Sequence, residues 1–250
     1  MFWPRVAAAS LSGASDARWA ARAAPHVGWA VLGGVALDGP TRAAARAMVE
    51  RDREEFLPPD PVAFVDRQLA ALEAAPVRPG VNVRSVDPDP VAAVAATCRR
   101  YDAVLEVNAH CRQGEMCAAG AGESLLRHPE RLCEQVAAAA DAGAAVSVKV
   151  RTEVDGVDLP TLARRVVDAG ADAVHVDAMD TEPVVGDVAA AVPFVVANNG
   201  VRDRATAHEY LALGADAVSV GRPSDDPRVL ARVARATEAW FERREAAPDA

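Results

Sequence analysis

The chain has 250 residues, of which 51% are hydrophobic and 25% are charged, and its net charge is −9. This composition excludes global disorder, because the chain has enough apolar surface to bury a large core. The acidic balance argues against a broad nucleic-acid-binding surface, which needs clustered Lys and Arg. Aromatic residues make up only 4%, so we expect a core built mostly of Ala, Val and Leu.

Cysteine content and the lack of targeting signals indicate a reducing compartment. The four cysteines are Cys98, Cys111, Cys117 and Cys133, too few for a disulfide framework in a chain of this length. The N-terminal segment has no basic region followed by a long apolar run, and no stretch reaches the ~18 apolar residues that a membrane helix needs. We therefore predict a cytoplasmic protein with reduced cysteines and no membrane association.

Eight short apolar segments recur along the chain and have the composition of buried strands. They cover residues 5–10, 27–34, 80–85, 103–108, 144–151, 173–178, 193–200 and 217–224. Amphipathic segments between them predict helices over 15–25, 40–55, 61–74, 89–100, 130–142, 159–168, 181–191, 203–213 and 226–246. Strands that alternate regularly with helices predict a parallel sheet covered by helices.

Eight strand–helix units in a chain of this length predict an α/β fold, the (β/α)8 TIM barrel, as a single domain over residues 1–250. The stretch 40–79 is long for one connection, so we expect it to hold two helices. A last helix is predicted over 226–246, and no Pro- or Ser-rich linker marks a second domain.

A barrel predicts where chemistry occurs, because its functional residues gather at the carboxyl ends of the strands. Two such ends, Asn198–Gly200 and Gly221–Arg222, pair a glycine with polar neighbours. Glycine allows a ligand to approach the backbone closely, and the following helix N-terminus offers free N–H groups. These two loops therefore predict a phosphate site, to which Arg222 adds a guanidinium group.

Cys111 lies three residues after Asn108 in a loop that contains several glycines, and we expect its thiol to be accessible. An ordinary thiol is protonated at neutral pH, so it can donate a proton as well as attack. Cys98 and Cys133 are expected to be packing residues. The spacing of His110, Cys111 and Cys117 is not that of zinc ligands, so no metal is predicted.

Lys149 is the only lysine among the 27 basic residues and lies in the middle of an apolar strand. Alternation along the strand places Lys149 and Arg151 on one face, which we expect to point into the barrel. Two uses remain open at this point. The ammonium group can neutralise an anionic cofactor, or a desolvated amine can form a Schiff base.

Taken together, these segments resemble the tRNA-dihydrouridine synthases, a family of FMN-dependent (β/α)8 enzymes. The segment NAHCRQGEMCAAGAGESLLRHPERL, followed by VSVKVR, is similar to the family's Asn-x-Gly-Cys-Pro loop, its glycine-rich segment and its Val-Lys-x-Arg strand. AAASLSGASDARW, VNVRSVDPDP, VVANNGVRD and GADAVSVGRP resemble four other family segments in the same order. The likeness spans roughly residues 5–230.

The resemblance implies a flavin-dependent oxidoreductase that acts on the 5,6 double bond of a uracil-like ring, free or in tRNA, with FMN as cofactor and NAD(P)H as reductant. It implies three catalytic residues: Cys111 as proton donor, Asn108 as a contact to the base, and Lys149 as a contact to the flavin. The cofactor-binding residues that it implies are Ser10, Ser12, Asn82, Lys149, His175, Asp177, Asn198, Asn199, Gly200, Gly221 and Arg222.

Four positions depart from the family pattern, and the first is Asn82, where the family usually has Gln. Arg112 stands where the family has Pro, His110 where it has Gly, and Asp177 where it has a flavin-contacting His; His175 lies two residues earlier. We expect a short, archaeal-type relative without the C-terminal helical domain that grips tRNA. The residues leave two alternatives open: a Schiff-base lyase or aldolase that uses Lys149, and a non-catalytic phosphate-binding barrel.

Overall fold

The computed structural model describes residues 2–246, so residues 1 and 247–250 of the predicted domain lie outside the described residues. Eight parallel strands pair in sequence order and close into a barrel, because β1 also pairs with β8. The strands are β1 Val6–Ala8, β2 Trp29–Ala36, β3 Arg78–Arg84, β4 Val104–Ala109, β5 Ala145–Arg151, β6 Ala173–Asp177, β7 Val195–Asn198 and β8 Ala217–Val220. The predicted (β/α)8 barrel is confirmed.

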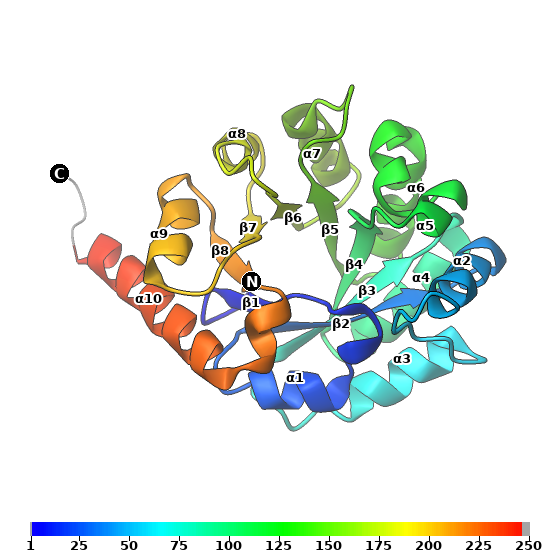
Figure 1. The fold of residues 1–250 in the computed structure, drawn as a ribbon, viewed down its shortest axis with the longest axis horizontal. Coiled ribbons are helices and arrows are strands. Elements are labelled where there is room, and N and C mark those ends of the chain that lie inside the picture. Colours follow the sequence, from blue (N-terminus) through cyan, green and yellow to red (C-terminus); the bar gives the residue numbers. More distant parts are fainter. Residues whose placement is uncertain (1, 247–250) are drawn as a thin grey trace.

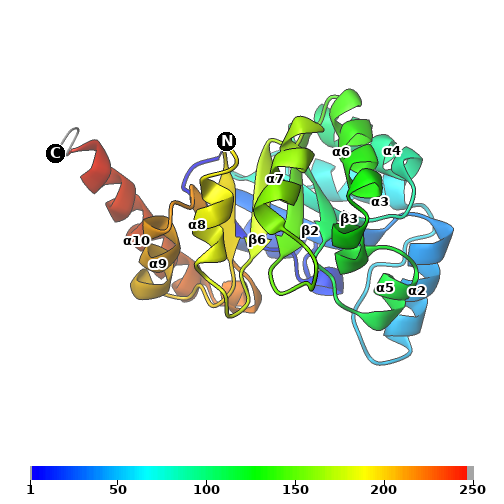
Figure 2. The ribbon, with the colours of Figure 1, turned by 90° about the horizontal axis from the view of Figure 1, so that it is seen from above.

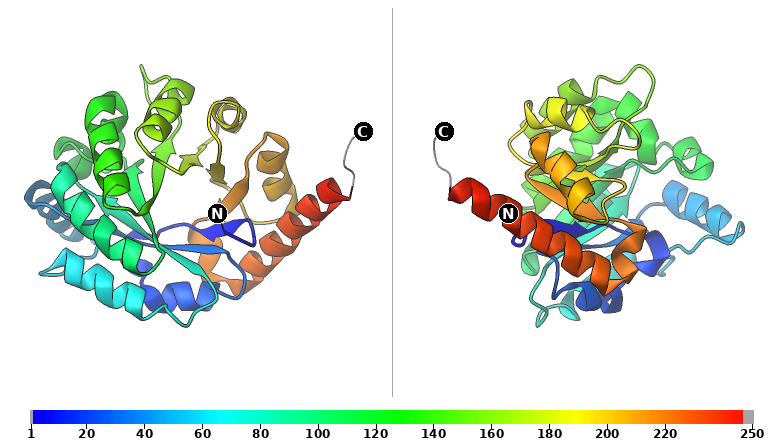
Figure 3. Two further views of the ribbon diagram at one scale, coloured as in Figure 1. Left: turned by 180° about the vertical axis from the view of Figure 1, so that it is seen from behind. Right: turned by 60° about the vertical axis from the view of Figure 1, so that its left-hand side comes forward.

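Helices surround the strands on the outside of the barrel (Figure 1). They are α1 Ala17–Ala23, α2 Gly39–Val49, α3 Pro61–Ala70, α4 Pro88–Arg100, α5 Gly114–Ala118, α6 Pro129–Asp141, α7 Leu159–Asp168, α8 Val184–Ala189, α9 Arg204–Ala212 and α10 Pro227–Glu245. The stretch 40–79 contains most of α2 and all of α3. The outer end of α10 extends beyond the barrel, as Figure 2 and Figure 3 show.

Helix starts are set by aspartates in seven of the described helices. In each, the Asp side chain accepts a backbone N–H of the first turn, which satisfies a donor that the helix itself leaves free. These caps are Asp16, Asp38, Asp60, Asp87, Asp158, Asp203 and Asp226. All but Asp60, which lies between α2 and α3, are in connections that lead from a strand to a helix, so they fix loops at the carboxyl ends of the strands.

Strand residues alternate between two cores. Val148 and Val150 of β5 face outward and belong to the core between the barrel and the helices. The inward-facing core near the strand starts consists of Ala7, Trp29, Val31, Val104, Phe194, Val196 and Ala217. Further along the strands, the buried positions include Asn82, Glu106, Lys149, His175 and Ser219. The barrel interior is therefore apolar at its amino end and polar at its carboxyl end.

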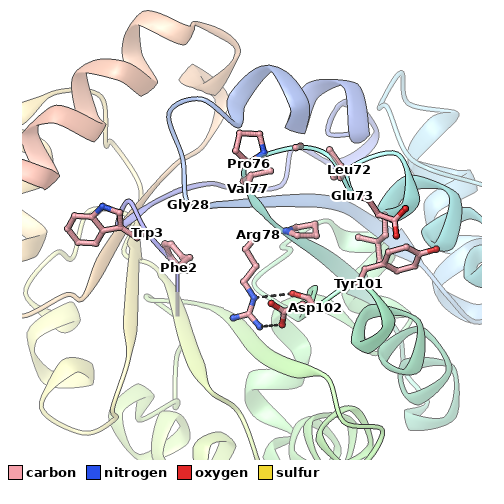
Figure 4. Close-up of a pocket in the computed structure, with 13 residues that line it drawn as sticks. Phe2, Trp3, Gly28, Leu72, Glu73, Pro76, Val77, Arg78, Tyr101 and Asp102 are labelled. Carbon is pink, nitrogen blue, oxygen red and sulfur yellow. Dashed lines mark hydrogen bonds and ion pairs between the residues drawn. The ribbon is translucent and has the colours of Figure 1, made fainter.

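The amino end of the barrel also has a hollow of about 440 Å³, shown in Figure 4. Phe2 and Trp3 lie on one side of it and Tyr101 on another, and Arg78 forms an ion pair of 2.8 Å with Asp102. This hollow lies at the opposite end from the strand carboxyl ends, where barrel proteins carry their functional residues. The functional site is therefore expected at the carboxyl end of the barrel.

Gly80 gives a test of the packing inside the barrel. A Cβ atom at this position would clash with the indole nitrogen of Trp29. Gly80→Ala should therefore lower the free energy of unfolding by about 1–3 kcal/mol, as overpacking of a filled core does. In urea denaturation, the control Gly39→Ala should show no loss, because nothing lies within 4 Å of that position. Equal stability of the two variants would contradict the packing described here.

Candidate active site

Two adjoining hollows of about 390 and 490 Å³ open at the carboxyl ends of the strands. They form one cavity, because they share Ser10, His110, Asp177, Asn199 and Arg222 as lining residues. Most of the predicted site residues line this cavity: Ser10, Ser12, Asn108, Cys111, Lys149, Asp177, Asn198, Asn199, Gly200, Gly221 and Arg222. Asn82 and His175 are not among the lining residues; both are fully buried.

Asn108, at the end of β4, holds the loop that carries Cys111. The side-chain oxygen of Asn108 accepts the backbone N–H of Cys111 at 3.1 Å. Cys111 lines the smaller hollow but is only 8% exposed, less accessible than the sequence predicts. The reason is local structure: the predicted glycine-rich loop contains α5 and a 3-10 helix over Gly122–Arg127, and Met116 of α5 packs in one cluster with Cys111.

The other cysteines lie away from the cavity lining. Cys98 is fully buried in the core, and burial raises the pKa of its thiol to about 12, consistent with a packing role. The Cys117 thiol donates a hydrogen bond of 3.5 Å to the carbonyl oxygen of Cys111, and Cys133 is half-buried on α6. Within residues 2–246, no group of three or more His, Cys, Asp or Glu side chains could hold a metal ion.

Lys149 lies on β5 and is 2% exposed, with its side chain on the wall of the larger hollow. It makes no hydrogen bond or ion pair with any residue in the range 2–246. Burial lowers the pKa of Lys149, while the nearby carboxylates of Glu106 and Asp177 act in the opposite direction. The ammonium group is therefore free to bind an acceptor atom of a ligand in the cavity.

Beneath the cavity, Glu106 joins two hydrogen-bonded chains. One of its oxygens accepts from the Asn82 amide at 2.8 Å, and the other accepts from Nδ1 of His175 at 2.6 Å. Asn82 in turn accepts from the Asn108 amide at 2.7 Å, and Nε2 of His175 contacts the Ser219 hydroxyl at 2.7 Å. The buried carboxylate thus connects β3, β4, β6 and β8 to the loop that carries Cys111.

The electrostatics of this network fit a charged Glu106 beside a neutral His175. Burial opposes the carboxylate charge, yet His175, Lys149 and the Asn82 hydrogen bond together lower the pKa of Glu106. Burial and the Lys149 charge lower the pKa of His175. A neutral His175 donates from Nδ1 to Glu106 and accepts at Nε2 from Ser219, so every polar atom of the pair is satisfied.

Sequence reasoning missed Glu106, Ser219 and the ion pair between Arg84 and Glu55. A signal for Glu106 exists: it precedes Asn108 by two residues in an apolar strand, so alternation places both side chains inside. No such signal marks Glu55, which lies in the connection between α2 and α3. Its carboxylate meets Arg84 at 2.5 Å because the connection between α2 and α3 passes beside the ends of β2 and β3, and the same guanidinium donates to Ser12 at 2.9 Å.

The two predicted phosphate loops meet at the larger hollow. Gly200 and Gly221 both line it, together with Arg222. Gly200 has φ +64° and Asn199 has φ +107°, backbone conformations that L-residues rarely adopt and that recur at ligand sites. The residues could hold a phosphate group through backbone N–H donors and one guanidinium.

Fold and cavity define this protein as a (β/α)8 barrel with a cationic site at the carboxyl ends of its strands. The sequence model of the dihydrouridine synthase (Dus) family matches residues 65–249, about three-quarters of the chain. The chain therefore belongs to the dihydrouridine synthase family. No helix within residues 2–246 has both the length and the apolar character to span a membrane.

Individual relatives are distant. An uncharacterised protein of Methanocaldococcus jannaschii is 26% identical over 149 residues, which are 59% of this chain and 58% of that protein. FabK from Thermotoga maritima is similar in structure, with a TM-score of 0.51 and 20% identity over 87% of this chain and 57% of FabK. Thiamine phosphate pyrophosphorylase from Pyrococcus furiosus is also similar in structure, with a TM-score of 0.54. The two chains are 12% identical, and the match covers 94% of this chain and 95% of the pyrophosphorylase. These structural likenesses show the fold alone.

The buried carboxylate gives a stability prediction. Glu106→Gln removes the charge and turns an amide N–H toward one of two buried donors, so we expect a loss of about 3 kcal/mol in the free energy of unfolding. Ser219→Ala removes one neutral hydrogen bond and should cost about 1 kcal/mol. Urea denaturation measures both, and equal effects would contradict the central place given to Glu106.

The imidazoles of His110 and His175 predict a loss of stability in acid. Burial and the Lys149 charge hold the pKa of His110 well below its usual value, and that of His175 is lowered as well. Below about pH 6.5 the unfolded chain binds protons at these histidines that the folded protein does not bind. The free energy of unfolding should therefore fall as the pH is lowered from 7.5 to 5.5. His110→Gln should reduce this fall, whereas His128→Gln, at an exposed position, should leave it unchanged.

Proposed function

We propose that the chain binds FMN in the cavity and, with NAD(P)H as reductant, reduces or in reverse oxidises the 5,6 double bond of a uracil-like ring. One observation carries this proposal: a buried lysine without a protein partner and a cysteine thiol line one cavity in a member of the dihydrouridine synthase family. When bound, FMN supplies hydride transfer, which no amino-acid side chain can perform.

The donor set fits FMN at both ends of the molecule. The Lys149 ammonium offers a positive charge to the acceptor edge of the flavin ring, since it has no partner within residues 2–246. Gly200, Gly221 and Arg222 offer a phosphate site of the kind that barrels form after their last two strands. Asn198 and Asp177 also line this hollow and would offer further polar contacts to the cofactor.

Cys111 acts as the general acid. As negative charge develops on the uracil ring, the thiol at the cavity wall donates its proton to the ring carbon. Asn108 keeps the thiol in place through the backbone N–H of Cys111, and the Asn82–Glu106 chain fixes the orientation of the Asn108 amide. The packing of Met116 against the thiol limits its access to water.

A Schiff-base lyase remains the second candidate, because Lys149 also has the burial and the lowered pKa that an amine nucleophile needs. The two candidates require different states of the same group: a charged ammonium toward the flavin, or a neutral amine toward a carbonyl substrate. Borohydride reduction in the presence of aldehydes separates them, since only an imine on Lys149 leaves a stable adduct.

Purified protein should take up FMN, show its absorbance and lose that absorbance on reduction by NAD(P)H. Lys149→Met should weaken FMN binding. Cys111→Ala should retain FMN and its reduction, but should slow the reaction with the uracil-like substrate by about 10²–10⁴-fold, the usual contribution of a placed proton donor. Cys117→Ala, a neighbouring thiol outside the cavity lining, is the matched control and should react normally.

A protein that takes up no FMN on reconstitution would contradict the proposal. A borohydride adduct on Lys149 would instead support the lyase. FMN binding without turnover of any uracil compound by the unaltered protein would support the non-catalytic barrel.

A further inference from the structure

Arginine is concentrated in the smaller hollow, beside Cys111. Five guanidinium-bearing residues line it, and Asp177 is the single carboxylate-bearing residue among its lining residues. These arginines are Arg53, Arg84, Arg112, Arg151 and Arg222. The chain as a whole carries a net charge of −9, so this concentration runs against the composition of the rest of the protein.

The five arginines are not equally available to a ligand. Arg84 and Arg151 are buried and neutralised, by Glu55 at 2.5 Å and by Glu123 at 2.7 Å respectively. Arg53 lies 3.6 Å from Glu55, whose carboxylate it shares with Arg84, and its Nε atom is buried without a hydrogen-bond partner.

Arg112 and Arg222 make no hydrogen bond or ion pair within the described part of the chain. Arg222 belongs to the phosphate loops of the larger hollow. This assignment leaves Arg112 as the cation of the smaller hollow without a partner among the described residues, and Arg53 as one whose partner carboxylate is shared with Arg84.

These two residues lie on the Cys111 side of the cavity. Arg112 follows Cys111 directly, and Arg53 lies in the connection between α2 and α3. Arg51 joins the two segments, because its guanidinium binds Glu115 of α5 at 2.6 Å and Gln113 at 3.2 Å. The two segments thus form one wall of the smaller hollow, which carries the thiol, the Arg112 guanidinium and the partly neutralised Arg53 guanidinium.

We propose that the substrate is a pyrimidine mononucleotide, whose phosphate binds Arg112 and Arg53 while its uracil ring lies beside Cys111. This inference rests on the proposed function. Guanidinium groups bind phosphate oxygens with paired, charge-assisted hydrogen bonds, and an uncharged base or nucleoside leaves both groups unmatched. The hollow of about 390 Å³ has the volume of a small-molecule site.

The charge distribution favours a mononucleotide over RNA. Because the smaller hollow holds five of the 27 basic residues, the rest of the chain is more acidic than the net charge of −9 indicates. A mononucleotide needs only the cationic hollow, whereas an RNA chain also needs contacts with the rest of the protein, whose net negative charge disfavours phosphate binding.

Binding to the FMN-loaded protein tests the inference without turnover. In isothermal titration calorimetry, uridine monophosphate should bind at least 10-fold more tightly than uridine or uracil. Arg112→Gln and Arg53→Gln should each remove most of this preference and leave the binding of uridine unchanged. Arg22→Gln, at an exposed position on α1, is the matched control and should keep the full preference. The flavin absorbance shows that each variant is folded and loaded.

Three outcomes would overturn the inference. The first is a loaded protein that binds uridine as tightly as uridine monophosphate, and the second is unchanged binding of the nucleotide by both arginine variants. The third is tighter binding of a uridine-containing oligonucleotide than of the mononucleotide, which would make RNA the ligand. A protein that takes up no FMN fails at an earlier step and overturns the proposed function itself.

Discussion

The arrangement of the cavity depends on one buried negative charge. Glu106 is fully buried, and its two oxygens accept hydrogen bonds from two directions, so that four strands and the Cys111 loop are tied to one point. Burial of Lys149 disfavours its charged ammonium form. The nearby negative charge of Glu106 opposes this effect and favours the ammonium form. A neutral residue at this position could not serve both purposes.

The fold was predictable because its signals are local and repeated. Each strand is a short apolar run, and most of the helices begin at an Asp that caps the first turn, so alternation and capping identify the (β/α)8 pattern without tertiary information. Much of the cavity follows from the same rule, since the end of a parallel strand places residues such as Lys149 and Asn198 at one rim. The short helix α5 was not predicted, because its five residues are too few to show an amphipathic repeat and glycines lie at both of its ends.

What could not be predicted depends on contacts between side chains from separate elements. Glu55 and Arg84 are 29 residues apart in the chain, and their pairing follows from the path of the α2–α3 connection over the rim. The position of His175 is a similar case. Its place in an apolar strand indicates only that its side chain is buried. The depth of His175 in the barrel depends on the stagger of the neighbouring strands. This stagger brings Glu106 and Ser219 to its two ring nitrogens.

The apolar plug at the amino end of the barrel has a kinetic consequence. Trp29, Val31 and Phe194 fill the interior there, so molecules exchange with solvent through the mouth at the carboxyl end. Under the proposed chemistry, the nicotinamide and the pyrimidine reach the cavity through this same mouth. We therefore expect each reactant, at high concentration, to hinder the entry of the other.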